Sequence, residues 1–313
     1  MSNSSSIVAI DVGGTTIKAA RLTSQGTAEE TLRLPTPVKE GPGVVLDAVA
    51  ETAAALVRPH TAAIGLCAPG LVDSASGTVR FAANLQLRDA PLVRLVTERT
   101  GLPVTLEHDV RAAALAEHRL GRGKELRDLF VVVLGTGVAA GIISGGQLIR
   151  GAQSMAGEFG HMTVRQGGEL CDCGQRGCVE AYTGARAVVR RYNRTGRQAQ
   201  TAADVTARLE TDHAAARIWD EATDALGRAL AGTTVLLDPQ MIVLAGGMAA
   251  AGHLVLQPVR KALAENLAWR SAPPIEVSPL GAGAGLLGAA LHAAETTGAF
   301  ALTDPASVLS ALR

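Results

Sequence analysis

Two segments of this chain repeat the same plan of an apolar strand, a glycine-threonine turn and a second apolar strand. The first runs IVAID-VGGTT-IKAARL from Ile7, and the second runs DLFVVVL-GTG-VAAGII from Asp128. Further predicted strands and helices follow each segment, and 313 residues can bury a large core in two domains. The sequence therefore predicts two related α/β domains facing a cleft: a small domain at 1–116 plus about 293–313, and a larger domain at 117–292.

Hydrophobic periodicity and turn residues predict the remaining elements. Helices are expected at 43–57, 91–100, 110–120, 185–192, 214–231, 255–267 and 284–294, and strands at 29–34, 62–67, 104–107, 241–245 and 275–277. Asp89 is expected to cap the helix at 91–100. Residues 129–149 carry no charge and are long enough to span a bilayer, but glycine turns divide them into runs typical of buried strands. No element is assigned to residues 296–313.

The stretch from Glu158 to Glu180 gathers one histidine and three cysteines. The residues are His161, Cys171, Cys173 and Cys178. Three thiolates and one imidazole form a complete tetrahedral set for zinc, with no position left for water, which indicates a structural metal. The alternative is that the cysteines pack in the core or form disulfides, although three cysteines cannot pair off completely.

Composition excludes several classes of partner. The net charge is zero and only 3% of residues are aromatic, so nothing favours nucleic acid or an anionic membrane surface. The N-terminal MSNSSS does not resemble a signal peptide. Cys67 lies in an apolar run and is expected to be a buried thiol. Four cysteines without a plausible disulfide framework suit a reducing cytoplasm.

The glycine-threonine turns have the chemistry of phosphate-binding loops. Asp11 ends a strand before Gly13, Gly14, Thr15 and Thr16, so backbone N–H groups and hydroxyls can hold phosphate while Asp11 orients Mg²⁺ through water. The alternative is an ordinary tight hairpin. Gly135, Thr136 and Gly137 form a second turn with the same donor chemistry, and the Gly246–Gly247 pair ends a strand where a base and ribose can approach the backbone closely.

Two competing nucleotide motifs are disfavoured. No G-x-x-x-x-G-K-[ST] sequence occurs, which excludes a P-loop. GTGVAA at 135–140 fits G-x-G-x-x-[GA], but that motif must open a helix, and the β-branched residues after it favour a hairpin.

Asp109 lies where an apolar strand ends and an alanine-rich helix begins. On position alone, a plain helix cap is the favoured role for an aspartate there. Its combination with two phosphate turns and a polar cluster makes it a candidate acid-base residue.

Taken together, these motifs resemble the ROK family of repressors, open reading frames and kinases. The resemblance is carried in order by DVGGTT at 11–16, APGLVD at 68–73, HD at 108–109 and GTG at 135–137. It rests above all on E-x-G-H at 158–161 followed by CDCGQRGCVE ending at Glu180.

The resemblance implies an actin-like, ribonuclease H-like ATPase fold and an ATP-dependent hexose kinase of the cytoplasm, a homodimer or homotetramer. Magnesium-ATP would sit on Asp11–Gly14 and Gly135–Gly137, and Asp109 would accept the proton of the attacking sugar hydroxyl. Zinc would orient His161. The sugar hydroxyls would be bound by Asn84, Glu158, His161 and Glu180, beside His108 and Asp109.

The chain departs from the family pattern at His108, where Asn is usual, and at Arg111, where a small polar residue is common. Ala139, Ala140 and Ala245 replace frequent glycines. The changes at His108 and Arg111 concern the identity of the sugar more than the reaction, and the methyl groups of the three alanines would narrow the nucleotide site without abolishing it. Glucose, phosphorylated at its 6-hydroxyl, is the leading substrate; the alternatives are mannose, fructose, allose and the N-acetylhexosamines.

Two further functions of the same family are weighed. A transcriptional repressor would carry a DNA-binding helix-turn-helix, but only six polar residues precede the first strand and the chain has no basic excess. A catalytically silent sugar sensor is suggested by His108 and the alanines. The presence of Asp11, Asp109 and both phosphate turns favours the kinase.

Overall fold

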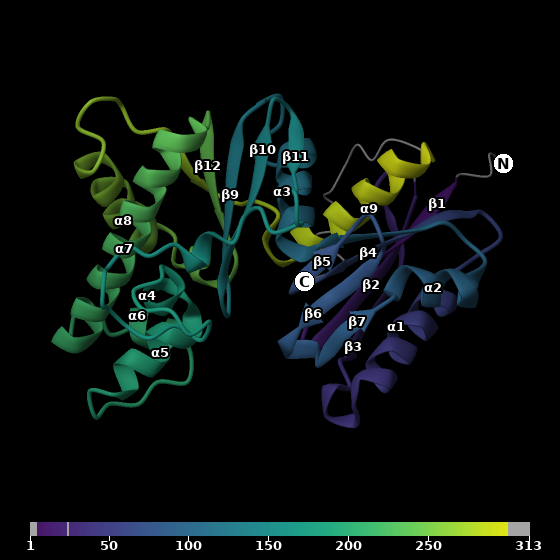
Figure 1. Cartoon of the computed structure of the whole chain (residues 1–313), viewed down its shortest axis with the longest axis horizontal. Coiled ribbons are helices and arrows are strands. Elements are labelled where there is room, and N and C mark those ends of the chain that lie inside the picture. Colours follow the sequence, from purple (N-terminus) through teal and green to yellow (C-terminus); the bar gives the residue numbers. More distant parts are fainter. Residues whose placement is uncertain (1–4, 24, 300–313) are drawn as a thin grey trace. The chain divides into compact units, whose positions relative to one another are not determined.

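The computed structural model describes residues 5–23 and 25–299, which form two compact units (Figure 1). The first unit comprises 5–23, 25–124, 150–156 and 282–299, and the second comprises 125–149 and 157–281. These boundaries differ from the predicted ones because α3 (Asp109–Leu120) and α9 (Ala284–Thr297) pack against each other and both belong wholly to the first unit. The predicted C-terminal region beyond 299 lies outside the described residues.

A five-stranded sheet in the order β3-β2-β1-β4-β8 forms the centre of the first unit. Its strands are β1 (Ser6–Val12), β2 (Thr16–Thr23), β3 (Ala28–Pro35), β4 (Thr61–Ala68) and β8 (Val104–His108). β2 is antiparallel to β1 and β3, whereas β4 is parallel to both β1 and β8. The carboxyl ends of β1, β4 and β8 therefore meet at one edge of the sheet.

Helices and a small second sheet complete the first unit. These elements are α1 (Pro42–Leu56), α2 (Leu92–Thr100), β5 (Leu71–Asp73), β6 (Thr78–Ala82) and β7 (Leu87–Ala90). α1 buries Val45, Val49, Ala53 and Leu56, which is the apolar face that its sequence spacing presents. α9 lies along β1 and β4, as Figure 1 shows, and its small side chains allow this close packing.

The second unit repeats the sheet plan in the order β11-β10-β9-β12-β13. Its strands are β9 (Leu129–Leu134), β10 (Val138–Ser144), β11 (Gln147–Ile149), β12 (Met241–Ala245) and β13 (Ile275–Val277). β9 and β10 form an antiparallel hairpin, and β12 is parallel to both β9 and β13. The two sheets are thus equivalent strand by strand, which accounts for the repeated sequence plan.

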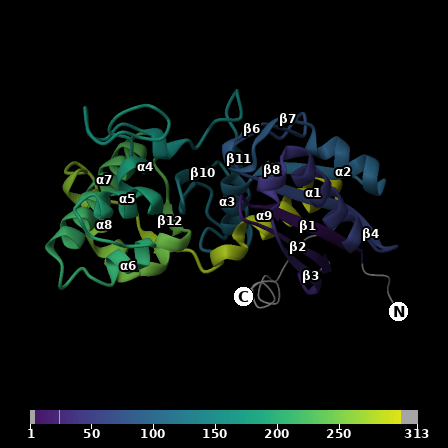
Figure 2. The same cartoon turned by 90° about the horizontal axis from the view of Figure 1, so that it is seen from below.

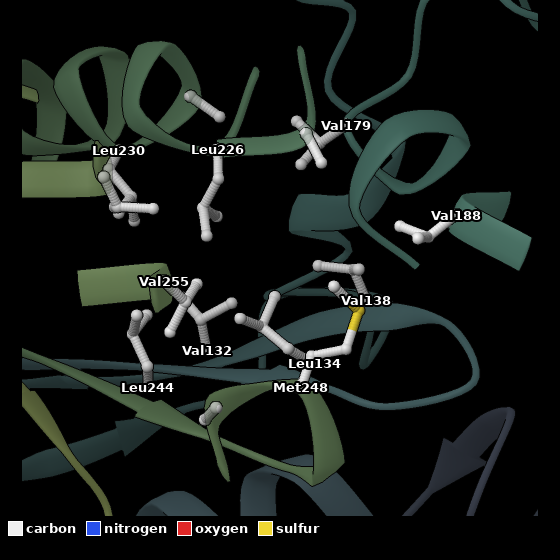
Figure 3. Close-up of a cluster of buried hydrophobic side chains, with 14 of the residues drawn as sticks. Val132, Leu134, Val138, Val179, Val188, Leu226, Leu230, Leu244, Met248 and Val255 are labelled. Carbon is white, nitrogen blue, oxygen red and sulfur yellow. The ribbon is translucent and has the colours of Figure 1, made fainter. Parts of the chain in front are cut away.

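Helices cover the second sheet and enclose its core. They are α4 (Glu180–Thr183), α5 (Ala185–Asn193), α6 (Ala202–Thr206), α7 (His213–Leu237) and α8 (His253–Glu265). Figure 2 shows α4, α5 and α6 beside α7, which contacts all three. Val132 and Leu134 of β9 meet Leu226 and Leu230 of α7 in the buried cluster of Figure 3.

Some local predictions were wrong or incomplete. Asp89 does not cap α2: it lies in β7, and Pro91 occupies the cap position without a side-chain hydrogen bond. The short strands β5, β6, β7 and β11 were not predicted. β9 and β10 form largely buried strands as predicted, whereas β11 is largely exposed. No helix among the described residues is long and apolar enough to cross a membrane.

Candidate functional site

The strand register brings the acidic residues of the first unit to one edge of its sheet. Asp11 on β1 pairs with Cys67 on β4, and Cys67 pairs in turn with Glu107 on β8. Asp109 follows two residues later as the first residue of α3. Ligand sites in α/β sheets form beyond the carboxyl ends of the strands, so Asp11 and Asp109 both stand where chemistry is expected.

Asp11 is held in a largely buried position. Its Oδ2 lies 3.4 Å from Lys18 Nζ, and its Oδ1 accepts a hydrogen bond of 3.6 Å from the Cys67 thiol. Burial raises the pKa of Asp11; Lys18 opposes this and the Asp109 charge adds to it. Burial, together with Asp11 and Asp109, raises the pKa of the Cys67 thiol well above its usual value. A bound cation would favour the ionised Asp11 that this environment penalises, so the site suits Mg²⁺.

The first glycine turn is a tight hairpin that still leaves donors free. Gly13 N–H donates to the Thr16 carbonyl at 3.0 Å, and the Thr36 hydroxyl donates to the Gly13 carbonyl at 2.6 Å. The N–H groups of Gly14 and Thr15 donate to no acceptor among residues 5–23 and 25–299. The hairpin and the phosphate loop, which were alternatives at the level of sequence, are therefore compatible.

Asn84 lies directly beside this turn. It belongs to the 3-10 helix η2 (Ala83–Leu85) and is exposed. A Cβ atom on Gly14 would stand 3.1 Å from the Asn84 Cβ and 3.2 Å from its Nδ2. Glycine at position 14 thus allows the amide to approach the backbone of the turn.

His108, rather than Asp109, caps helix α3. The Val110 N–H donates to His108 Nδ1 at 3.2 Å and to Asp109 Oδ1 at 2.7 Å. A neutral imidazole that accepts at Nδ1 carries its proton on Nε2, so His108 presents an N–H donor. Asp109 Oδ2 has no hydrogen-bond partner in the described part of the chain, and the side chain is 35% exposed.

Glu107 is a fully buried carboxylate just before these two residues. Burial raises its pKa, but Arg111 and Arg150 outweigh that effect and hold the pKa of Glu107 at about 2. Arg111 Nε lies 2.6 Å from Oε1, and Arg150 Nε lies 2.7 Å from Oε2. Glu107 is therefore ionised and structural rather than available to a substrate.

The second glycine turn, at the β9–β10 hairpin, is fixed by the helices that follow the cysteine loop. Ala185 N–H donates to the Gly135 carbonyl at 3.0 Å, and Val138 N–H donates to Glu180 Oε2 at 2.7 Å. A Cβ on Gly137 would stand only 2.5 Å from Glu180 Oε2, so a side chain there would displace the carboxylate from this position. As predicted, GTGVAA opens a strand and not a dinucleotide-binding helix.

A hollow of about 580 Å³ adjoins this turn within the second unit. Its lining includes Gly135, Thr136, Trp219, Gly247 and Met248. Gly246 precedes it at the end of β12 with φ 88°, a conformation that favours glycine. The hollow has the size and the mostly apolar walls of a small-molecule pocket. It joins two of the glycine segments to which the sequence assigned nucleotide binding.

The four predicted metal ligands lie together in the second unit. The ligand atoms of His161, Cys171, Cys173 and Cys178 are all within 4.8 Å of one another, and the cysteines form no disulfide. Cys173 Sγ and Cys178 Sγ are 3.7 Å apart. A tetrahedral zinc with Zn–S bonds of about 2.3 Å needs sulfur separations of about 3.8 Å, so this donor set fits zinc.

The two ring nitrogens of His161 face different neighbours. Nδ1 is 3.9 Å from the Cys171 sulfur, while Nε2 is 3.8 Å from Glu158 Oε2. A metal bound at Nδ1 would leave the proton on Nε2 and fix the orientation of the ring. The arrangement links the metal cluster to Glu158, which the sequence assigned to sugar binding.

The predicted site residues divide between the units. Asp11, the first turn, Asn84, His108 and Asp109 belong to the first unit, and Glu158, His161, Glu180, the second turn and the cysteines belong to the second. Sequence reasoning missed Lys18, whose only signal is its position opposite Asp11 on the antiparallel strand. It also missed Trp219, which is part of a helical apolar stripe, and Arg186, an exposed cation near Thr136 and Glu180.

Known proteins identify the family. The profile described as ROK family matches residues 7–296. The chain belongs to the ROK family. A glucokinase from Streptomyces coelicolor is 36% identical over 305 residues, with 90% of this chain and 96% of the relative covered. An N-acetylmannosamine kinase from Shigella flexneri is 32% identical over 296 residues, with 92% and 98% covered.

Solved structures of ROK proteins have the same fold. The ROK hexokinase from Thermus thermophilus superposes with a TM-score of 0.83 at 35% identity, covering 94% of this chain and 99% of the other. A ROK family glucokinase from Streptomyces griseus, in complex with glucose and AMPPNP, gives a TM-score of 0.78 at 35% identity, covering 93% and 99%. The predicted family and the α/β, actin-like ATPase fold are confirmed for this ROK chain.

Proposed function

We propose that this protein transfers the γ-phosphoryl group of ATP to the 6-hydroxyl of glucose. Its class is that of an ATP-dependent sugar kinase, in keeping with its family and its glucokinase relatives. One observation carries the proposal: Asp11, near the end of β1, and Asp109, just after β8, lie at the carboxyl ends of two parallel strands that flank β4, and Asp11 precedes a turn with unused N–H donors. Phosphoryl transfer needs mainly positioning and charge neutralisation, and this edge offers a metal-binding carboxylate, a base and phosphate donors.

Asp109 is the general base in this proposal. Its Oδ1 is taken by the Val110 N–H, which fixes the carboxylate, and its Oδ2 remains for the proton of the sugar hydroxyl. A positioned carboxylate contributes on the order of 10²–10⁴-fold to such a step. Asn84, beside the first turn, would bind another hydroxyl through its amide.

The glycine segments would supply the donors for the nucleotide. Gly14, Thr15, Thr136 and Gly137 have the backbone and hydroxyl donors for phosphate oxygens, and Gly246–Gly247 would accept the base and ribose. Asp11 would orient Mg²⁺, which neutralises charge on the phosphates. The Arg186 guanidinium, exposed near Thr136, would add a further positive charge.

Zinc would be structural and would be held by His161, Cys171, Cys173 and Cys178. In this role it fixes a loop and leaves His161 Nε2 as a hydrogen-bond donor near Glu158. Glu158 and Glu180 are suited to a polyhydroxyl substrate because carboxylates accept hydrogen bonds from hydroxyls. In Glu180, Oε2 already accepts a hydrogen bond from the Val138 N–H.

The choice of glucose rests on the glucokinase relatives, and an N-acetylhexosamine is the second candidate. N-acetylmannosamine kinases are also relatives, and His108 places an imidazole N–H where the family usually has an amide. An imidazole differs from an amide in size and in the direction of its donor, so His108 is the residue most suited to alter the choice of sugar.

A sugar panel tests the proposal. ADP release would be measured with glucose, mannose, fructose, allose, N-acetylglucosamine and N-acetylmannosamine, and zinc would be determined on the same sample. We expect the highest kcat/KM with glucose. A higher kcat/KM with another sugar would replace glucose as the substrate, and binding of sugars without ADP release would identify a silent sensor.

A further inference from the structure

Glu107 is the centre of a hydrogen-bond network that reaches several segments of the first unit. Its Oε1 accepts from Arg111 Nε at 2.6 Å, from the Ser74 hydroxyl at 2.9 Å and from the His108 N–H at 2.9 Å. Its Oε2 accepts from Arg150 Nε at 2.7 Å. The backbone just before Asp109 is therefore fixed by a carboxylate that is itself held on both oxygens.

Arg111 extends the network with its remaining nitrogens. Nη1 donates to the Ser154 carbonyl at 2.7 Å, and Nη2 donates to the Val72 carbonyl at 3.1 Å. Arg111 is only 2% exposed, so its ion pair with Glu107 is a buried contact and not a surface salt bridge. One planar guanidinium thus joins β8, β5 and the segment 150–156, a geometry that an ammonium group cannot reproduce.

The segment 150–156 has an unusual course in the chain. Residues on both sides of it belong to the second unit, yet the segment itself belongs to the first. It contains Ser154 with φ 56°, a conformation that is uncommon for a residue other than glycine. The chain then continues into Glu158 and His161, the proposed sugar-binding residues.

We infer that Arg111 is a positioning residue that holds the base Asp109 and the segment leading to Glu158 in one fixed arrangement. The inference rests on the proposed function of Asp109 and Glu158. Arg111 acts through two contacts: it orders Glu107, which fixes the His108 N–H, and it binds the Ser154 carbonyl directly. Neither contact involves substrate, so the residue is not itself catalytic.

Substitutions can separate the two roles of Arg111, which are to balance the charge of Glu107 and to hold the Ser154 carbonyl. Arg111→Met removes the tether but leaves Glu107 with one cation fewer, which by itself destabilises the fold. The double variant Glu107→Gln/Arg111→Met removes both buried charges while the Ser154 tether stays absent. Arg111→Lys keeps the charge without the fork. Arg94→Met, on the exposed face of α2, is the matched control for loss of an arginine.

Three readouts would be compared for every variant: kcat and KM for glucose by ADP release, the thermal midpoint, and amide hydrogen exchange of residues 108–112 and 150–156. We expect the double variant to recover the midpoint lost in Arg111→Met. We also expect its kcat to stay down by about 10–100-fold, with fast exchange in 150–156, because small misplacements of reacting groups are costly. If neither Arg111→Met nor the double variant folds, Arg111→Lys tests the inference: we expect its kcat to fall while its thermal midpoint stays at the wild-type value.

The inference is overturned if kcat returns together with the midpoint in the double variant, or if Arg111→Lys matches wild type in kcat and exchange. Its failure is distinct from that of the proposed function. A wild-type protein that releases no ADP with any sugar contradicts the kinase, whereas the exchange of 150–156 still reports whether Arg111 holds the segment.

Discussion

The Glu180 carboxylate accepts a hydrogen bond of 2.7 Å from the backbone N–H of Val138. The residue that ends the cysteine loop therefore also holds the second glycine turn, 42 residues earlier in the chain. A residue assigned to sugar binding is in this way connected to backbone assigned to the nucleotide. The connection leads to two predictions about coupled binding.

Glu180→Ala should weaken binding of both glucose and the ATP analogue AMPPNP. Loss of a hydrogen bond to a charged acceptor costs about 1.5–3 kcal/mol, which corresponds to roughly 10–100-fold in affinity. Isothermal titration with each ligand measures the effect, and the exposed Glu210→Ala is the control. A change confined to glucose would mean that Glu180 does not order the turn.

Gly137→Ala should disturb the same connection from the other side. The new methyl carbon would stand 2.5 Å from Glu180 Oε2, so the carboxylate must move and release Val138. We expect KM to rise for both substrates. Gly232→Ala in α7, where the nearest neighbour would be 3.8 Å away, is the matched control. Unchanged KM values for Gly137→Ala would contradict the tight fit.

Cys173→Ser should remove zinc and destabilise the second unit. Cys173 is the exposed cysteine of the four ligands, so this substitution disturbs packing least. Metal analysis should find about one zinc per wild-type chain and a large loss in the variant, with a lower thermal midpoint, because structural zinc contributes directly to folding. Cys67→Ala should keep its zinc. An equal zinc content in Cys173→Ser would refute the cluster.

The free energy of unfolding should decrease at low pH because Glu107 becomes protonated. Arg111 and Arg150 outweigh the effect of burial and lower the pKa of Glu107 from 4.5 to about 2. The stabilisation from ionised Glu107 is complete above its pKa in the unfolded chain and is lost as the pH falls through its pKa in the folded protein. The loss amounts to about 3 kcal/mol in the free energy of unfolding. Urea unfolding between pH 5 and pH 2 measures it.

Glu107→Gln provides the comparison for this pH dependence. Its free energy of unfolding should be lower at pH 7, because the buried Arg111 and the partly exposed Arg150 lose their charged partner, and should fall less steeply in acid. Wild type and variant with the same slope between pH 5 and pH 2 would show that Glu107 is not the group responsible.

The parts of this protein that are predictable from its sequence are those specified by residues close together in the chain. Three metal ligands fall between Cys171 and Cys178, so their spacing alone indicates the cluster. The two sheets follow from repeated strand-turn-strand segments, and GTGVAA is recognisable as a hairpin because β-branched residues follow it. The fold class depends on such local patterns and was predicted correctly.

What the sequence does not reveal depends on long-range contacts. The Glu107 network joins side chains at 74, 111 and 150, and no local pattern identifies those partners. Asp89 resembles a helix cap, but pairing of β6 with β7 places it in a strand instead. Similarly, Asp109 had the position of a cap, while the imidazole of His108 takes that role.

The central claim is that Asp109 removes the proton from a glucose hydroxyl during phosphoryl transfer. The most direct test compares Asp109→Asn with wild type in ADP release and in glucose affinity by titration. The account predicts a loss of kcat on the order of 10²–10⁴-fold with glucose affinity changed little, since the amide keeps the shape but cannot accept the proton. Retention of full turnover by Asp109→Asn would contradict it.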